Sequence, residues 1–221
     1  MKSLLTLGLV LSLGAAAAAA PPPNAKAIAD GVDRRYNDLR TLRAEFTEIY
    51  RGAGIERTES GTLWLKRPGK MRWEYRQPRE KLFLADGKDA WFYVPGERQA
   101  RKAPLKKLDD LRSPLRYLLG RTKLAKEFND LAPAPDVAPL TRANVMLRGA
   151  PRGMADRVTA VLLEITPASR IARLVIEEVD GATTEFRFSD IAENQAVSDH
   201  KFQLSLPPDV EIVESAEESG P

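Results

Sequence analysis

The stretch Lys70-Met71-Arg72-Trp73-Glu74-Tyr75-Arg76 decides the fold class of this 221-residue chain. Apolar and charged side chains alternate along it one by one. Successive side chains of a β-strand point to opposite faces, so this alternation predicts a strand with one apolar face and one charged face. The flanking pairs Pro68-Gly69 and Gln77-Pro78 are typical of turns. The segment is therefore predicted to be one strand of an antiparallel sheet.

Short segments rich in aromatic and aliphatic residues continue this pattern on both sides. Strands are predicted over Phe46–Tyr50, Thr62–Lys66, Met71–Arg76, Lys81–Ala85, Ala90–Val94, Val145–Leu147, Thr159–Thr166, Arg170–Glu178, Thr183–Phe188 and Lys201–Leu206. Breaks such as Asp86-Gly87 and Asp180-Gly181 separate several of them. Closely spaced strands without intervening helices favour an antiparallel meander. Leu82–Leu84 and Ala90–Val94 are apolar at successive positions, so both faces of the sheet need cover there.

Two helices and one irregular connection complete the expected elements. Ile28, Val32, Leu39 and Leu42 form one apolar stripe at helical spacing, which predicts a helix over Lys26–Leu42. Ser113–Leu119 is predicted to be a short helix, with a serine cap followed by proline in the first turn. Leu131–Leu140 contains three prolines and is interpreted as an irregular connection. The fold class expected is α+β.

The first twenty residues have the order of a secretory signal. Met1-Lys2 is followed by the apolar run Leu4–Leu13 and by the small residues Ala15–Ala20. The apolar run is shorter than the roughly 20 residues that cross a bilayer. We therefore expect residues 1–20 to be a cleaved signal peptide and residues 21–221 to form a single domain. An uncleaved N-terminal anchor is the alternative.

The residues needed for most kinds of site chemistry are missing or scattered. The chain has no cysteine and one histidine, His200, which excludes the usual zinc and transition-metal ligand sets. Neither a Gly-x-Ser-x-Gly nucleophile motif nor a phosphate-binding Gly-Lys-Ser/Thr loop occurs. His200 is interpreted as an ordinary surface or turn residue. We expect no metal, no cofactor and no enzymatic activity.

Charge is unevenly distributed along the chain. There are 34 Lys and Arg against 31 Asp and Glu, and 20 of the basic residues against 11 of the acidic ones fall between Arg51 and Asp130. From Asp209 onward there are five acidic residues and no basic one. This pattern fits a solvated surface with an acidic tail, or a basic face for acidic partners or lipid headgroups. Nucleic acid binding is disfavoured, because alternation places the arginines of residues 70–76 opposite the aromatic side chains.

Several segments, in order along most of the chain after residue 20, resemble the LolA family of periplasmic carriers. They are Leu42–Thr47, Gly61–Tyr75 with Gln77-Pro78, Ala85–Lys88 with Trp91–Pro95 and Gln99, and finally Ala196-Val197, Lys201-Phe202 and Pro207–Val210. Two departures are notable. Glu48 stands where the family's first strand usually has glutamine, and Leu131–Leu140 has no familiar pattern.

The resemblance implies a half-open, unclosed β-barrel, a curved antiparallel sheet with a helical lid packed in its concave face. It implies a monomeric periplasmic chaperone that shields the acyl chains of lipoproteins. Its partners would be an inner-membrane ABC transporter, acylated lipoproteins and an outer-membrane acceptor, and not nucleic acid. Arg67 matches a strand-end arginine whose hydrogen bonds to the lid favour the closed, unloaded state.

The resemblance also suggests which residues line the lipid cavity. These are Phe46, Leu63, Leu65, Met71, Trp73 and Tyr75, together with Trp91 and Tyr93. Alternation alone does not decide whether Trp91 and Tyr93 or Phe92 and Val94 face the cavity. Plain core packing is the alternative interpretation for each of these residues.

Other functions remain open at this stage. A LolA-like periplasmic sensor or binder of free lipids or other hydrophobic ligands is the main alternative, although such sensors usually carry a second domain. The absence of a lipid-bearing cysteine favours a soluble shuttle over a lipid-anchored acceptor. A lipid hydrolase would require a nucleophile and a base that the sequence does not bring together.

Overall fold

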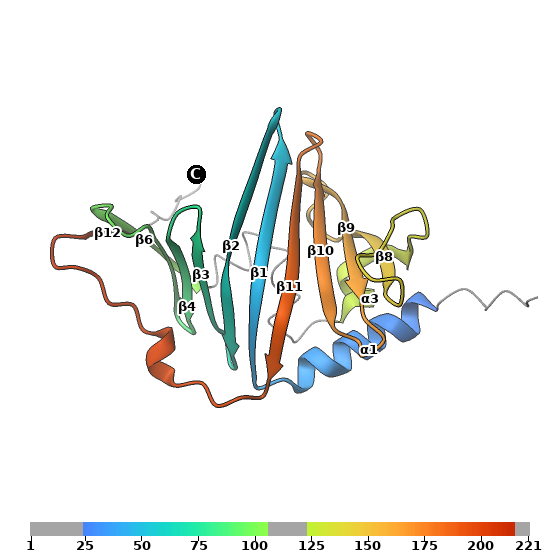
Figure 1. Cartoon of the computed structure of the whole chain (residues 1–221), viewed down its shortest axis with the longest axis horizontal. Coiled ribbons are helices and arrows are strands. Elements are labelled where there is room, and N and C mark those ends of the chain that lie inside the picture. The colour runs from blue at the N-terminus through green and yellow to red at the C-terminus, as the bar shows by residue number, and fades with distance from the viewer. Residues whose placement is uncertain (1–23, 106–122, 215–221) are drawn as a thin grey trace, which may run out of the picture.

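The computed structural model describes residues 24–105 and 123–214, and they build one curved, unclosed sheet (Figure 1). Its strands are β1 Thr41–Gly52, β2 Ile55–Lys66, β3 Lys70–Gln77, β4 Lys81–Asp86, β5 Asp89–Tyr93, β6 Gln99–Pro104, β7 Phe128–Pro133, β8 Val145–Pro151, β9 Val158–Ile165, β10 Ile171–Glu178, β11 Thr183–Glu193 and β12 Glu211–Glu214. Their spatial order is β12-β6-β5-β4-β3-β2-β1-β11-β10-β9-β8-β7. Neighbours are antiparallel except β12 and β6, which are parallel. The predicted α+β class with an unclosed sheet is confirmed.

In the described residues, three short helices accompany the sheet: α1 Ala25–Asp38, α3 Leu124–Glu127 and the 3-10 helix η2 Asp199–Phe202. The side-chain oxygen of Asn24 accepts a hydrogen bond from the Ala27 N–H at 3.2 Å and so caps α1. Within the described ranges, no helix combines the length and apolar character that crossing a membrane requires. The predicted signal peptide, the helix at Ser113–Leu119 and the end of the acidic tail lie outside the described residues.

The predicted helix over Lys26–Leu42 is too long. Helix α1 ends at Asp38, Leu39 is already extended, and Leu42 belongs to β1. Leu39 and Leu42 are buried, as the apolar stripe predicted, but Leu39 directly follows the helix and Leu42 lies in β1. An apolar residue at helical spacing does not reveal whether the backbone stays helical up to it.

The predicted strands are confirmed with longer bounds in most cases, while the end of the chain differs. Lys201–Leu206 is not a strand, because η2 covers its first two residues and the rest is irregular. The Ser198 hydroxyl caps η2 by accepting from the His200 N–H at 3.3 Å. Strands β6, β7 and β12 were not predicted, and β7 takes up the first residues of the Leu131–Leu140 connection. β6 and β12 lack a strong apolar alternation, so pairing with neighbours defines them.

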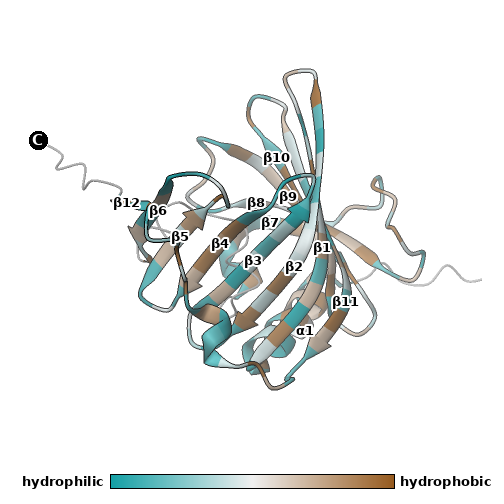
Figure 2. Ribbon diagram, turned by 60° about the vertical axis from the view of Figure 1, so that its left-hand side comes forward, coloured by the Kyte–Doolittle hydropathy of each residue, from teal (hydrophilic) through white to brown (hydrophobic). Residues whose placement is uncertain are grey.

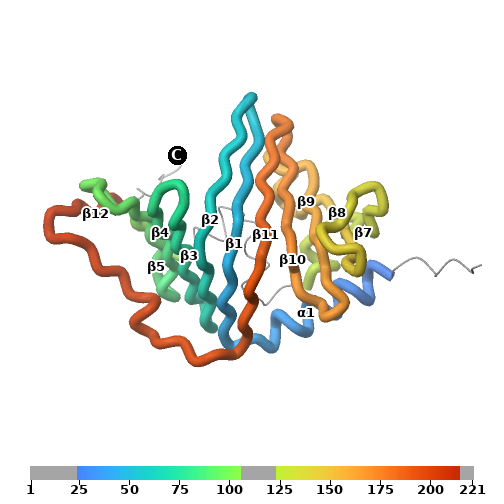
Figure 3. Tube along the Cα trace, viewed as in Figure 1, coloured from blue at the N-terminus to red at the C-terminus, as the bar shows by residue number. Residues whose placement is uncertain are grey.

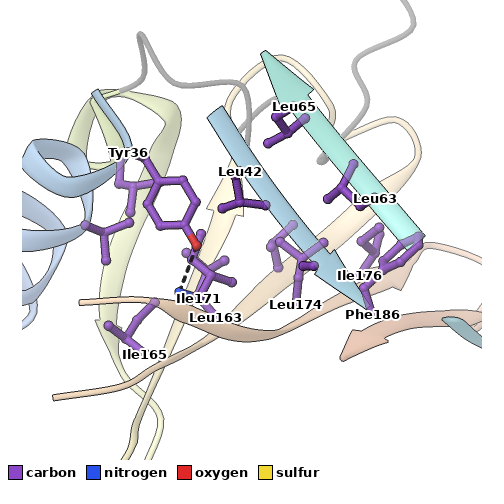
Figure 4. Packing of buried hydrophobic residues seen from close by; sticks show 14 of the residues in the cluster. Tyr36, Leu42, Leu63, Leu65, Leu163, Ile165, Ile171, Leu174, Ile176 and Phe186 are labelled. Carbon is purple, nitrogen blue, oxygen red and sulfur yellow. Dashed lines mark hydrogen bonds between the residues drawn. The ribbon is translucent and has the colours of Figure 1, made fainter. Parts of the chain in front are cut away.

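The main core lies on the concave face of the sheet. Helix α1 contributes Ala29, Val32 and Tyr36 to the same cluster as β1–β3 and β8–β11. In Figure 1, α1 runs below the lower ends of β10 and β9. Figure 4 shows the ring of Tyr36 among side chains from β1 and β2 and from β9 and β10. The concave face and the helix therefore share one apolar interior.

Two irregular segments cover the convex face. Residues 134–144 lie over β8–β10, where Ala134 and Val137 pack with Leu162 and Met146. Residues 194–210 run from β11 past β3 and β4 to the outer edge at β12 (Figure 3). Lys201 of this segment lies 3.7 Å from the ring centre of Trp64 and 2.9 Å from a carboxylate oxygen of Glu74. The sequence predicted that both faces of the sheet need cover. Helix α1 packs on the concave face, and these two segments cover the convex face.

Candidate lipid-binding face

The strand register brings the predicted cavity residues together on one face. Leu63 lies directly opposite Trp73, and Leu65 lies opposite Met71. Directly paired residues of antiparallel strands share a face of the sheet. By the same register, Phe46 and Tyr75 join them on the concave side through Gly61, which lies between the two. Six of the eight predicted residues therefore form one surface.

Gly61 on β2 allows the backbone of β3 to approach closely within this surface. A Cβ atom at residue 61 would lie 1.9 Å from the carbonyl oxygen of Glu74, closer than any side chain can approach. The absence of a side chain therefore leaves room for the backbone of β3. On either side of Gly61, the ring centres of Tyr75 and Phe46 lie 4.9 Å apart. The two rings meet edge to face, a favourable arrangement for aromatic pairs.

Trp73 is the centre of an aromatic cluster. Its ring centre lies 4.7 Å from Phe46, 5.6 Å from Phe186 and 6.3 Å from Phe188. Trp73 is only 1% exposed. Phe186 and Phe188 were not among the predicted cavity residues, although their spacing of two in a predicted strand indicated that they share a face.

Trp91 and Tyr93 lie on the opposite, convex face, so their assignment to the cavity is wrong. Trp91 is paired with Leu84, and its indole N–H donates to the Asp86 carboxylate at 3.2 Å. In these strands the concave side carries Phe83 and Phe92, which are directly paired. In Figure 2, β4 and β5 carry both hydrophobic and hydrophilic residues along their ribbons. Both faces being apolar, only the register could decide between the two pairs.

Arg67 connects the end of β2 to helix α1. Its guanidinium donates a hydrogen bond to the carbonyl oxygen of Tyr36, in the last turn of the helix. Its backbone N–H donates to the carbonyl oxygen of Arg40 at 2.9 Å. A cation is favourable at a helix C-terminus, where the carbonyl groups lack partners within the helix. The predicted arginine therefore contacts the helix that covers the concave face.

Further polar contacts attach α1 to the sheet. The Tyr36 hydroxyl accepts a hydrogen bond from the Ile171 N–H at 3.1 Å, drawn as a dashed line in Figure 4. Burial raises the pKa of Tyr36 to about 12. The Arg35 guanidinium pairs with the Glu193 carboxylate, to which Arg170 also donates at 3.0 Å. The helix is thus attached by a few separate contacts along its second half.

A polar group interrupts the apolar lining at one end. Glu48 lies on the concave face and accepts a hydrogen bond from the Tyr75 hydroxyl at 2.6 Å. Burial raises the pKa of this carboxyl. Its cross-strand neighbour Glu59 is 6% exposed and lies 2.6 Å from the Lys81 ammonium group. The glutamate that departs from the family pattern is therefore part of the concave surface.

His200 lies away from this surface, in η2, with its ring nitrogen 2.9 Å from the Gln203 side-chain oxygen. In the part of the chain that the structure describes, no group of three or more His, Cys, Asp or Glu side chains is arranged to hold a metal ion.

Known proteins resemble this chain along most of its length. An outer-membrane lipoprotein carrier protein from Nitrosospira multiformis is 28% identical over 181 residues, which cover 80% of this chain and 83% of the relative. One of the same name from Dechloromonas aromatica is 29% identical over 196 residues, covering 85% and 89%. The crystal structure of MucB superposes with a TM-score of 0.50 at 13% identity, covering 82% of this chain and 62% of MucB. That likeness concerns the fold alone.

The family model described as outer membrane lipoprotein carrier protein LolA matches residues 37–205. The match runs from the end of α1 through η2 and includes the whole concave surface described above. The chain therefore belongs to the LolA family.

Proposed function

We propose that this protein is a periplasmic chaperone that carries acylated lipoproteins to the outer membrane. The acyl chains would lie on the concave surface around Trp73, between the sheet and helix α1. The cargo would come from an inner-membrane ABC transporter and pass to an outer-membrane acceptor, with the carrier acting as a monomer. The observation that carries the proposal is this aromatic cluster on the concave face of an unclosed sheet in a LolA-family chain.

The energetics of acyl chains explain why such a surface is needed. At about 0.8 kcal/mol per buried methylene, a chain of about 16 carbons requires on the order of 12 kcal/mol of shielding from water. A carrier must bury most of that chain and still release it. A helix that covers the same surface in the empty protein competes with the ligand and so favours release.

Arg67 is proposed to set this competition. Its hydrogen bond to the Tyr36 carbonyl stabilises the covered state and is lost if α1 moves away. A hydrogen bond to a charged group contributes about 1.5–3 kcal/mol, enough to shift the balance between covered and loaded states by one to two orders of magnitude. Without it, the loaded state would persist.

A release assay tests both parts of the proposal. Spheroplasts that display a labelled triacylated lipoprotein are incubated with the protein, with Arg67→Leu or with Lys66→Leu. Lys66 is the matched control, because its ammonium group bonds to the Val197 carbonyl at 2.7 Å on the other side of β2. We expect one-to-one soluble complexes with all three proteins. Transfer to acceptor-containing outer membranes should be impaired for Arg67→Leu alone.

Two outcomes would contradict the proposal in different ways. If Arg67→Leu unloads as fast as the wild type, Arg67 does not control the covered state. If no lipoprotein is released while free fatty acids or phospholipids bind, the protein is a binder of free lipids. That second function is the alternative expected from the sequence.

A further inference from the structure

The concave surface continues beyond its buried part to the free edge of the sheet. The register sets one row of side chains across six strands: Leu63 on β2, Trp73 on β3, Phe83 on β4, Phe92 on β5, Arg101 on β6 and Val213 on β12. Leu63 and Trp73 are 0% and 1% exposed, whereas Phe92 and Val213 are each 38% exposed. The row therefore leads from the core to solvent without leaving the concave face.

Arg101 occupies this row between two apolar side chains. It is exposed, and among the described residues its side chain takes part in no hydrogen bond, ion pair or ring contact. The next residue of the strand, Lys102, points to the convex face and is compensated there. Its ammonium group lies 3.4 Å from the carboxylates of both Asp89 and Glu214 and 5.3 Å from the ring centre of Trp91. Lys102 therefore has counterions, whereas Arg101 has none among the described residues.

We infer that Phe92, Arg101 and Val213 form an outer lipid subsite, which holds the diacylglyceryl-cysteine linkage of the cargo. This inference rests on the proposed function. The acyl chains run inward along the row toward Trp73, and the Arg101 guanidinium donates to the ester carbonyl oxygens at the linkage. A guanidinium is weakly hydrated compared with an ammonium group, so it suits a position between apolar side chains.

The dimensions of the row fit this role. From Leu63 on β2 to Arg101 on β6 there are four strand-to-strand steps of about 4.8 Å, or about 19 Å in all, close to the extended length of an acyl chain of about 16 carbons. Such a chain would cover Phe83 and Phe92 and place its ester group near Arg101. The exposure of this edge then matches the polar end of the ligand.

Strand β12 supplies a matched pair of positions for the test. Val213 and Ile212 are adjacent, are 38% and 49% exposed, and point to opposite faces. The chain has no cysteine, so Val213→Cys and Ile212→Cys can each be labelled with one environment-sensitive fluorophore. The ligand is a synthetic lipopeptide that begins with S-diacylglyceryl-cysteine. We expect its binding to shift the emission of the probe at residue 213 to the blue and to leave the probe at residue 212 unchanged.

Affinity measurements with the same lipopeptide test the residues directly. A charge placed in an apolar contact is unfavourable, so Phe92→Glu and Val213→Glu should weaken binding about tenfold or more. Ile212→Glu should bind like the wild type. Arg101→Gln should weaken binding by about threefold to tenfold, the range for one lost hydrogen bond, with Arg101→Lys in between. Lys102→Gln should have no effect.

The outcomes separate this inference from the function on which it rests. If the wild type binds the lipopeptide but the paired positions respond alike, the outer subsite is wrong while the carrier function stands. If the wild type neither binds the lipopeptide nor releases lipoproteins from spheroplasts, the carrier function and the subsite fall together.

Discussion

The two halves of the sheet differ in how firmly they are held. The inner half is the part of the sheet that contains β8–β11, and the outer half is the part that ends in β5, β6 and β12. In the inner half, fully buried leucine and isoleucine side chains lie at Leu147, Leu163, Ile171 and Leu174, and α1 is attached to β10 and β11. In the outer half, every residue of β12 is exposed, and Phe92 on β5 is 38% exposed. Within residues 24–105 and 123–214, β12 pairs over four residues and only with β6.

This difference suggests a division of labour along one continuous sheet. Buried apolar contacts provide most of the stability of a domain, whereas segments with few such contacts open at low cost in free energy. A carrier needs a stable frame and a surface that accepts and releases ligand. The inner half suits the first need and the outer edge the second.

The largest expected effect contrasts a buried side chain with an exposed one. Leu174→Ala should lower the free energy of unfolding by about 2–5 kcal/mol, because Leu174 is 0% exposed and its removal leaves a cavity. Phe92→Ala should cost about 1 kcal/mol or less, since part of the ring already faces water. Urea unfolding followed by circular dichroism measures both. Equal losses would show that the outer half is packed as firmly as the inner half.

A smaller effect is expected from comparable ion pairs in the two halves. Arg35→Ala breaks the contact of α1 with Glu193, where the side chains are 25% and 16% exposed, and should cost about 1–3 kcal/mol. Lys102→Ala removes two contacts on β6 that are each 3.4 Å long, one to Asp89 and one to Glu214, whose side chain is 73% exposed, and it should leave the unfolding midpoint nearly unchanged because such long contacts are weak. A measurable loss for Lys102→Ala alone would reverse the proposed ranking of the halves.

Two carboxyl groups should respond to pH in opposite directions. Burial acts to raise the pKa of Glu193, but hydrogen bonds from Arg35 and Arg170 outweigh it, so the pKa lies below its ordinary value of 4.5. Its contribution to stability is present above pH 4.5 and is lost as the pH falls through the folded-state pKa. Burial raises the pKa of Glu48 above 4.5 despite the hydrogen bond from Tyr75. Its contribution is present below pH 4.5 and is lost as the pH rises through the folded-state pKa.

Glutamine variants check these signs. The stability deficit of Glu193→Gln relative to the wild type should be largest near neutral pH and shrink on acidification below about pH 4.5. Glu48→Gln should gain stability relative to the wild type as the pH rises above that value. Urea midpoints from pH 3 to pH 8 provide the measurement, with roughly half-unit steps around the ordinary glutamate pKa. Parallel curves for a variant and the wild type would refute the assigned shift.

The smallest effect is expected at His200. Its side chain is exposed and contacts Gln203 within η2, so His200→Ala should change stability by less than about 0.5 kcal/mol. Release of lipoproteins should also be unaffected. Loss of function with intact folding would instead support a hydrolase that uses this histidine.

Much of the architecture could be predicted because its signals are local. Period-two alternation in residues 70–76 predicted β3 and its apolar face, and Asp180-Gly181 predicted the hairpin turn, where Gly181 has a φ of 84°. The ordered motifs from Leu42 to Val210 indicated the family that the comparisons establish. These features depend on neighbours in sequence, which a single chain displays directly.

Tertiary structure decided the features that depend on distant partners. Trp91 and Tyr93 could be placed on the convex face only through pairing with β4, because the chain is apolar at every position from Ala90 to Val94. The pairing of polar β6 with β12 and the contact of Arg67 with Tyr36 likewise join residues far apart in sequence. The end of α1 at Asp38 could not be predicted either, because the apolar residues that follow it are buried whether the backbone is helical or extended. By itself the sequence determined most of the strands, several of their turns and the family, since backbone preference and alternation are local properties. Which face each outer strand presents, and where the lining meets solvent, was decided by the register of the assembled sheet, because a shift of one residue exchanges the two faces.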